Sequence, residues 1–212
     1  FPEVLAWEKF MWDSYDDYRA AVAAGIRESS PEARIGFHFQ HSGLLGDFSW
    51  RIGERPENPV AWADFVKPSI YPGASGSLYR DHHRFAQSTW LNDLDSQTAH
   101  AALSQIFGRS PNAGEEVLNP GAPEQFAFGP DWCRAEMARF VTGSAPLPVY
   151  AGMSMGIPGG ERADTVELVR ACTEACLEGG ADGFIFSRGY SEMNPDHLKA
   201  AGEVVREAYP LN

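Results

Sequence analysis

Four short apolar runs, separated by stretches with helical periodicity, constrain the fold of this chain more than any other feature. The runs lie in RIGFHFQH (34–41), DFVKPSIYPG (64–73), PLPVYAGMSMG (146–156) and ADGFIFSRG (181–189). Each run is apolar at first and then becomes polar or rich in glycine. Strands that alternate with helices form parallel sheets, and their ligand sites lie beyond the carboxyl ends of the strands. The sequence therefore predicts four parallel strands whose polar ends converge on one site.

The segments between these runs predict helices. In residues 14–29, Ser14 is a candidate N-cap, and an apolar stripe at helical spacing follows it. The remaining helices that we predict are 58–63, 76–108 in two pieces, 130–142, 161–180, and 195–209 with Asn194 as its cap. Residues 109–129 are rich in Gly, Pro and Asn and predict an irregular insertion. Because no linker composition interrupts the chain, we expect a single domain over 1–212.

Charge and composition exclude several classes of protein. The net charge of −12 argues against nucleic-acid binding, and no apolar run approaches the length of a bilayer span. The opening FPEVLAWEKFMWD has neither a basic n-region nor a cleavage site, so we expect no signal peptide, and the missing initiator Met suggests a cut domain or a processed product. Cys133, Cys172 and Cys176 predict apolar core positions rather than a metal site.

The segment ACLEGGADGFIFSRGYSEMNPDHLKAAGEVVREAY (175–209) resembles the final βα unit of a (β/α)8 barrel. Together with RIGFHFQH, WADFVKPSIYPG and FPEVLAWEKFMWDSYDDYR, it resembles the C-terminal half of glycoside-hydrolase-like barrels of loosely β-galactosidase type. This resemblance implies a TIM (β/α)8-barrel-like fold, of which this chain holds strands 5–8, with FPEVLAWEKF as the loop after the fourth strand. It also implies an oligosaccharide or small-molecule substrate, with the missing half-barrel or a second chain as partner.

Glycoside hydrolysis requires two carboxyl groups, one as proton donor and one as nucleophile or base. Glu192 follows the last strand and is the first catalytic candidate, although an ion pair with Arg188 would also explain it. Glu8 is the second candidate, and Glu3 is a weaker one. The segment VYAGMSMGIPGGE, where the resemblance places the usual nucleophile, has no carboxylate before Glu161.

The strand ends and loops also supply candidate substrate-binding side chains. Alternation along the first strand places His38 opposite Phe37 and Phe39. Lys67 is the most unusual residue, because a lysine on an apolar strand has to meet a carboxylate such as Glu192 or contact the substrate. The full set of binding residues that we predict is His38, Gln40, Asp47, Trp50, Lys67, Tyr71, Tyr150, Arg188 and Tyr190.

Two other functions remain open. Lys67 could form a Schiff base with a carbonyl substrate, which would make the chain a lyase or aldolase. The chain could also bind carbohydrate without catalysis. DHHR (81–84) favours a solvated helix face over a metal site, and GIPGGE (156–161) favours a plain loop over a phosphate site. We expect neither a metal nor a cofactor.

Overall fold

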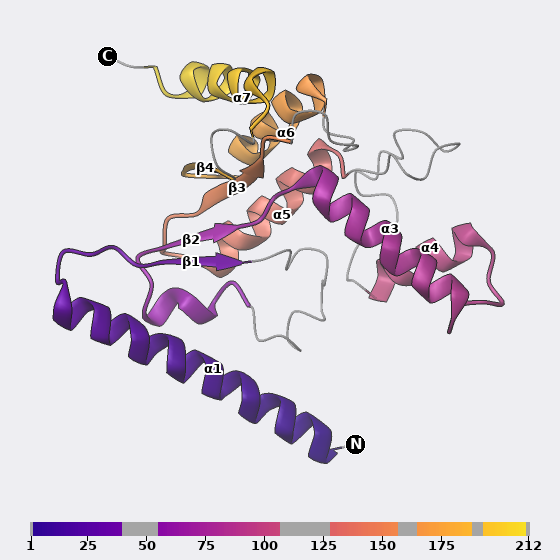
Figure 1. The fold of residues 1–212 in the computed structure, drawn as a ribbon, viewed down its shortest axis with the longest axis horizontal. Helices are drawn as coiled ribbons and strands as arrows, with labels where there is room; N and C mark the ends of the chain where they lie inside the picture. The colour runs from indigo at the N-terminus through magenta and orange to yellow at the C-terminus, as the bar shows by residue number, and fades with distance from the viewer. Residues whose placement is uncertain (1, 40–54, 107–127, 157–164, 188–192, 211–212) are drawn as a thin grey trace.

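The computed structural model describes residues 2–39, 55–106, 128–156, 165–187 and 193–210 (Figure 1). Helices and short parallel strands alternate through most of this part of the chain. The elements in chain order are α1 (Pro2–Ser29), β1 (Gly36–Phe39), the 3-10 helix η2 (Asn58–Ala61), β2 (Phe65–Pro68), α3 (Pro72–Ser88), α4 (Ser96–Ile106), α5 (Pro130–Gly143), β3 (Tyr150–Ser154), α6 (Val166–Glu178), β4 (Gly183–Ser187) and α7 (Pro195–Ala208).

The four strands all run in the same direction. β1 pairs with β2 and β3 pairs with β4, both in parallel. Isolated parallel bridges join the two pairs, from Val66 to Val149 and from Ser69 to Gly152. The carboxyl ends of the strands therefore lie at one edge, as the sequence predicts.

The predicted TIM-barrel-like fold, including its reading as strands 5–8 of a barrel, is wrong. The described residues form a mixed α/β structure with two small two-stranded sheets, and strand pairing within them does not close into a barrel. Runs that are apolar and then polar, separated by helices, are typical of parallel α/β proteins in general. That pattern predicts the direction of the strands, whereas closure depends on strand tilt and stagger, which a local pattern does not encode.

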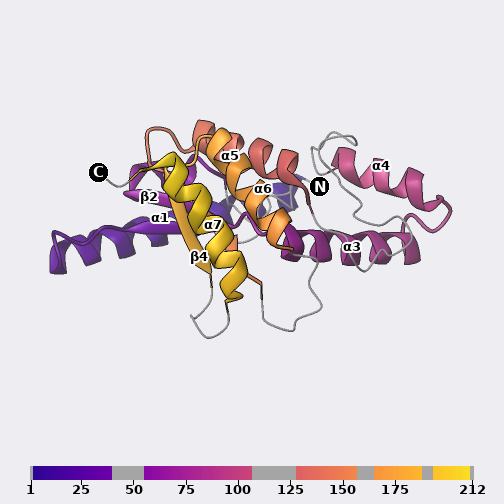
Figure 2. The ribbon, with the colours of Figure 1, turned by 90° about the horizontal axis from the view of Figure 1, so that it is seen from above.

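The helices α5, α6 and α7 form a layer on one face of β3 and β4. Figure 2 shows them side by side, with α6 in contact with both neighbours. Alternation along β3 sends Ala151 and Met153 into the core, where the Cys176 thiol of α6 lies 3.8 Å from the Met153 sulfur. Tyr150 and Gly152 lie on the opposite face of the strand, which therefore points away from this layer.

All three cysteines are buried, which confirms their prediction as core residues. Cys133 of α5, and Cys172 and Cys176 of α6, are free thiols. Burial, together with the two neighbouring thiols, raises the pKa of the Cys133 thiol well above its ordinary value. These thiols therefore behave as small apolar side chains at the α5–α6 contact.

The longest helix, α1, differs most from the sequence prediction. It begins at Pro2, so the segment predicted as a loop is helical, and Ser14 lies within the helix and donates to the Phe10 carbonyl (2.7 Å) instead of capping it. Ala23 is its one buried residue among those described. Arg27, near its end, lies 3.0 Å from Asp64, which also accepts the Ile35 amide at 2.7 Å.

The remaining helices follow the prediction closely. α3 and α4 are the two predicted pieces, and α5 begins at Pro130 as expected. Asn194 caps α7 by accepting from the Asp196 amide (3.0 Å), and Thr165 caps α6 by accepting from the Leu168 amide (3.1 Å). Most of the predicted insertion, 109–127, lies outside the described residues. None of the described helices is both long enough and apolar enough for a bilayer span.

Candidate functional site

Five polar side chains meet at the carboxyl ends of the strands, and we call them the strand-end cluster. They come from β1, from β2 and the turn after it, and from β4: His38, Lys67, Ser69, Tyr71 and Ser187. Lys67 lies at the centre. Its Nζ donates to the Tyr71 hydroxyl (2.9 Å) and to the Ser187 hydroxyl (3.2 Å), and it lies 3.4 Å from His38 Nε2. The hydroxyls of Tyr71 and Ser187 also share a hydrogen bond.

The path of Lys67 depends on a glycine in the neighbouring strand. The side chain starts on β2, crosses β3 over Gly152 and reaches Ser187 on β4. A Cβ at Gly152 would lie 2.7 Å from Lys67 Cε and 2.7 Å from the Pro68 carbonyl oxygen. Both separations are well below van der Waals contact, so glycine at this position makes room for the lysine.

The environment of Tyr71 favours its ionised form. Burial is the largest single influence and raises the pKa of the phenol. The hydrogen bonds from Lys67 and Ser187, the positive charge of Lys67 and a further hydrogen bond with Ser69 together outweigh it and leave the pKa below the ordinary value of 10.0. Tyr71 therefore loses its proton more readily than a tyrosine in water, and its phenolate is more populated at a given pH.

His38 and Ser69 form the other side of the cluster. His38 Nε2 lies 2.8 Å from the Ser69 hydroxyl. His38 is exposed, whereas Ser69 is buried with a relative exposure of 5%. This side of the cluster thus offers a solvent-accessible imidazole next to a fixed hydroxyl, and either can donate a hydrogen bond to a ligand.

The structure brings together three of the predicted site residues: His38, Lys67 and Tyr71. Ser69 and Ser187 were missed as site residues, although alternation places Ser69 on the same face as Lys67 and Ser187 is the last residue of β4. Alternation was the signal that could have found Ser69.

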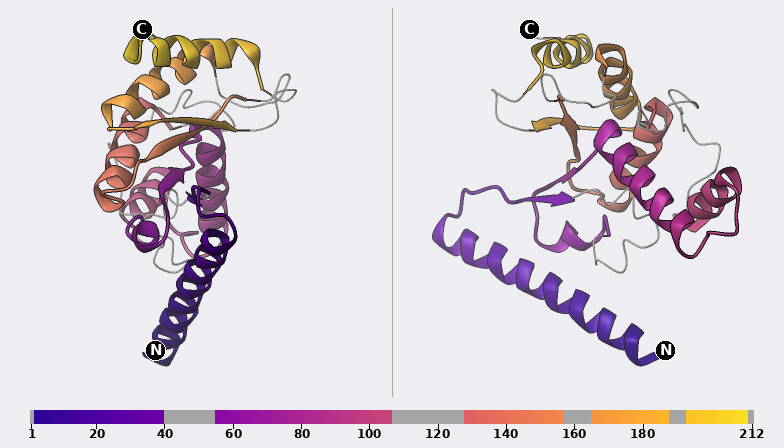
Figure 3. Two further views of the ribbon diagram at one scale, coloured as in Figure 1. Left: turned by 90° about the vertical axis from the view of Figure 1, so that its left-hand side faces the viewer. Right: turned by 45° about the vertical axis from the view of Figure 1, so that its right-hand side comes forward.

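Tyr150 and Glu8 occupy other positions. Tyr150 is the first residue of β3, and its ring packs edge-on against Phe65, the first residue of β2, with 5.5 Å between centroids. It therefore lies at the opposite end of the strands from the cluster. Glu8 lies in the N-terminal half of α1, and Figure 3 shows this end of the helix extending away from the strands.

Several predicted residues cannot be placed relative to the cluster. The following lie outside the described residues: Gln40, Asp47, Trp50, Arg188, Tyr190 and the catalytic candidate Glu192. The five described members of the strand-end cluster include no carboxylate. Nor does any group of three or more His, Cys, Asp or Glu side chains in the described ranges have an arrangement that could hold a metal ion.

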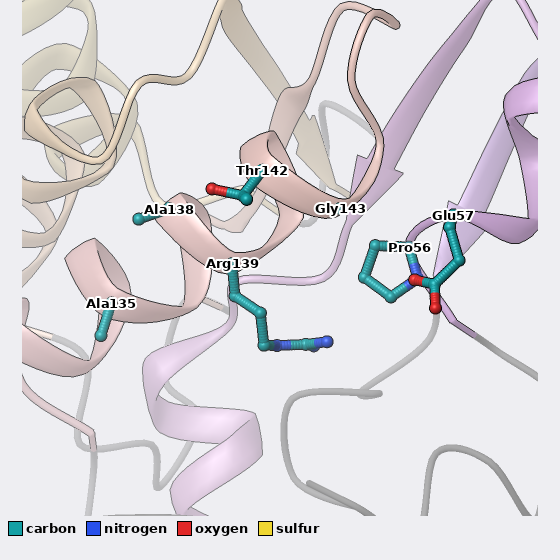
Figure 4. A pocket seen from close by; sticks show the side chains of 7 residues that line it. All are labelled: Pro56, Glu57, Ala135, Ala138, Arg139, Thr142 and Gly143. Carbon is teal, nitrogen blue, oxygen red and sulfur yellow. The ribbon is translucent and has the colours of Figure 1, made fainter.

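A separate pocket lies between α5 and the segment before η2 (Figure 4). Its lining is Pro56, Glu57, Ala135, Ala138, Arg139, Thr142 and Gly143. Arg139 is its strongest binding group, but the two carboxylate oxygens of Glu136 already accept from its guanidinium at 2.6 and 3.1 Å. Because that charge is neutralised within α5, the strand-end cluster is the better candidate site.

Comparisons with protein-family models, with curated proteins and with solved structures found no match to this chain. By its fold and its strand-end cluster, the chain is a mixed α/β protein in which Lys, Tyr, Ser and His side chains meet at the strand ends. The resemblance to glycoside-hydrolase-like proteins stays a prediction, as do the carbohydrate substrate, the second chain and the single domain.

Proposed function

We propose that the strand-end cluster is a carbonyl-processing site of the lyase or aldolase type, in which Lys67 forms a Schiff base with the substrate. One observation carries the proposal: Lys67 Nζ lies 2.9 Å from the hydroxyl of Tyr71, whose pKa is lowered. A nucleophilic lysine needs a nearby group that removes its proton, and Tyr71 is in position to do so.

The chemical steps follow from these contacts. Tyr71 as phenolate takes a proton from the Lys67 ammonium, and the free amine attacks the carbonyl carbon of the substrate. The electron pair of the C=O bond moves to oxygen, which takes that proton back from Tyr71 to give a carbinolamine. Loss of the hydroxyl as water, with a further proton from the amine nitrogen relayed through Tyr71, leaves an iminium ion. In sum, an ammonium and a carbonyl give an iminium and one water.

Ser187 has a positioning role in this scheme. It accepts from Lys67 at 3.2 Å and hydrogen-bonds the Tyr71 hydroxyl. Fixing both groups at once keeps the amine within reach of its proton acceptor, which is the geometric requirement for general base catalysis.

Hydrolysis by paired carboxylates is less well supported. Of the two catalytic candidates, Glu8 lies on α1 away from the cluster, and Glu192 is outside the described residues. Glycoside hydrolysis therefore stays a prediction from the sequence. It would require a carboxylate pair, whereas Schiff-base chemistry requires an amine and a proton acceptor, both of which the described cluster contains.

Borohydride trapping tests the proposal directly, because hydride reduces an iminium to a stable secondary amine. The chain contains three lysines, Lys9, Lys67 and Lys199, so each site can be quantified by peptide mass spectrometry. Lys9 pairs with Asp13 on exposed α1, and Lys199 is exposed on α7. With glyceraldehyde as probe at neutral pH, we expect the adduct at Lys67 to exceed that at either exposed lysine.

Variants distinguish a reactive lysine from an accessible one. Tyr71→Phe removes the proton acceptor and should lower trapping at Lys67 to the level of Lys199. The matched control Tyr209→Phe changes a tyrosine that donates to the Ala181 carbonyl and should leave trapping unchanged. Equal adducts at all three lysines in the wild type would overturn the proposal.

A further inference from the structure

The strand-end cluster has two halves with different chemistry. Lys67, Tyr71 and Ser187 form the half that would carry out the reaction. His38 and Ser69 form a second half that neither bonds the substrate carbon nor transfers a proton in the Schiff-base steps, although Ser69 also hydrogen-bonds Tyr71. The halves meet where Lys67 Nζ lies 3.4 Å from His38 Nε2. The position of the second half suggests that it recognises a substrate group next to the reacting carbonyl.

The charges in the cluster favour an anionic group at that position. The hydrogen-bond partners described for Lys67 Nζ are two hydroxyls and one imidazole, and none of them is a carboxylate. A partly buried cation is stabilised when an anion approaches it. The whole chain has a net charge of −12, which repels an anionic substrate at long range. Such a substrate would therefore be stabilised only by short contacts with the local positive charge of Lys67.

The start of α3 adds to the positive potential at the cluster. The helix begins at Pro72, directly after Tyr71, and its first-turn backbone bond runs from the Ser75 amide to the Tyr71 carbonyl at 2.7 Å. The amino end of a helix carries a partial positive charge and favours anions nearby. The positive charge of Lys67 and the amino end of α3 therefore both favour the binding of an anion at the strand-end cluster.

We propose that the substrate of Lys67 is a 2-oxo carboxylate, whose carboxylate accepts hydrogen bonds from His38 and Ser69 while Lys67 attacks the adjacent carbonyl carbon. This inference rests on the proposed Schiff-base function. In a 2-oxo acid the carboxylate is bonded to the carbon under attack, so both groups have to be bound within a few ångströms. The 3.4 Å between Lys67 Nζ and His38 Nε2 meets that requirement.

Two probes of nearly equal size separate the substrate class from the function. Pyruvate carries the carboxylate, and methyl pyruvate has the same carbonyl without the charge. For each probe, the borohydride-trapped adduct at Lys67 is divided by the adduct at exposed Lys199, which cancels the different reactivities of the two carbonyls. Because charged hydrogen bonds are the stronger ones, we expect this ratio to be at least about tenfold higher for pyruvate.

Variants of His38 assign the effect to the proposed contact. His38→Asn withdraws the donor at the Nε2 position and should bring the pyruvate ratio down to that of methyl pyruvate. His38→Gln keeps a donor near that position and should retain most of the preference. Circular dichroism spectra identical to wild type would show that both variants fold.

The outcomes are distinct for the two proposals. If both probes label Lys67 above Lys199 to the same degree, the Schiff-base function stands and the 2-oxo carboxylate is wrong. A pyruvate preference that survives in His38→Asn would also overturn the assigned contact. If neither probe labels Lys67 above Lys199, the proposed function falls as well.

Discussion

Gly152→Ala tests whether the crossing of Lys67 over β3 links the packing of the strands to the chemistry of the cluster. The new methyl group would lie 2.7 Å from Lys67 Cε, 3.2 Å from its Nζ and 2.7 Å from the Pro68 carbonyl oxygen. The lysine can swing aside, but the carbonyl belongs to the backbone of β2. Relief of that contact therefore requires β2 and β3 to move apart at the Ser69–Gly152 bridge.

The expected loss of stability can be set between known limits. Extra volume in a well-packed interior costs typically about 1–3 kcal/mol, and replacing glycine by alanine returns about 0.4–1 kcal/mol by restricting the unfolded chain. The net destabilisation is then between about 0 and 2.6 kcal/mol, with a middle value of about 1.3 kcal/mol. With a urea dependence of about 2 kcal/mol per molar, the middle value corresponds to a fall in the unfolding midpoint of roughly 0.6 M.

Urea unfolding followed by tryptophan fluorescence measures this shift, since Trp62 and Trp132 are buried with exposures of 8% and 6%. Gly25→Ala is a matched control: the new methyl group would have no atom within 4 Å on exposed α1, and the change should stabilise the helix by about 0.5–1 kcal/mol. Gly152→Ala should also lower trapping at Lys67 relative to Lys199. A variant with the wild-type midpoint and wild-type trapping would refute the proposed role of Gly152.

Three further changes test other parts of the structure. Lys67→Met removes a hydrogen bond and a charge that lower the pKa of Tyr71, while the burial that raises this pKa remains. The pKa of Tyr71 should therefore rise, and an ultraviolet difference titration against Tyr71→Phe measures the change. An unchanged pKa would contradict the contact between Lys67 and Tyr71. Phe140→Ala deletes a ring that is 1% exposed and should cost about 3–5 kcal/mol in chemical unfolding, whereas Phe85→Ala at a 63% exposed position should change stability by less than about 0.5 kcal/mol. The Ile35 amide, with Arg27, lowers the pKa of Asp64 below 3.8. The ionised Asp64 carboxylate therefore stabilises the folded state above pH 3.8, and this contribution is lost as the pH falls through the folded-state pKa. Asp64→Asn should lack this acid-dependent loss in thermal unfolding measured across pH.

The local parts of the fold could be predicted from the sequence. Period-two alternation correctly separated Phe39, which is fully buried, from His38 on the opposite face. Helix starts followed from Pro130 and from the cap Asn194. Lys67 was recognisable as unusual because a cation on an apolar strand requires polar partners, and the structure supplies them in Tyr71 and Ser187.

The parts that could not be predicted depend on distant contacts. Ser187 joins Lys67 across a whole strand, and only the register of β2, β3 and β4 brings the two together. The barrel and the loop at the start of the chain both came from extending a local resemblance. Residues 2–13 contain good helix formers such as Leu5, Ala6 and Met11, and this intrinsic preference was a better guide to α1.

The exposure of His38 leads to one more consequence for the trapping experiment. Water reaches this side of the cluster. An iminium at Lys67 that borohydride has not yet reduced should therefore hydrolyse back to amine and carbonyl. If Schiff-base formation is a rapid equilibrium, adduct yield at Lys67 should saturate with the concentration of the carbonyl probe at fixed borohydride. The yield at Lys199, which lacks a bound state, should increase linearly over the same range. Linear behaviour at both lysines would mean that the cluster does not bind the carbonyl compound before it reacts.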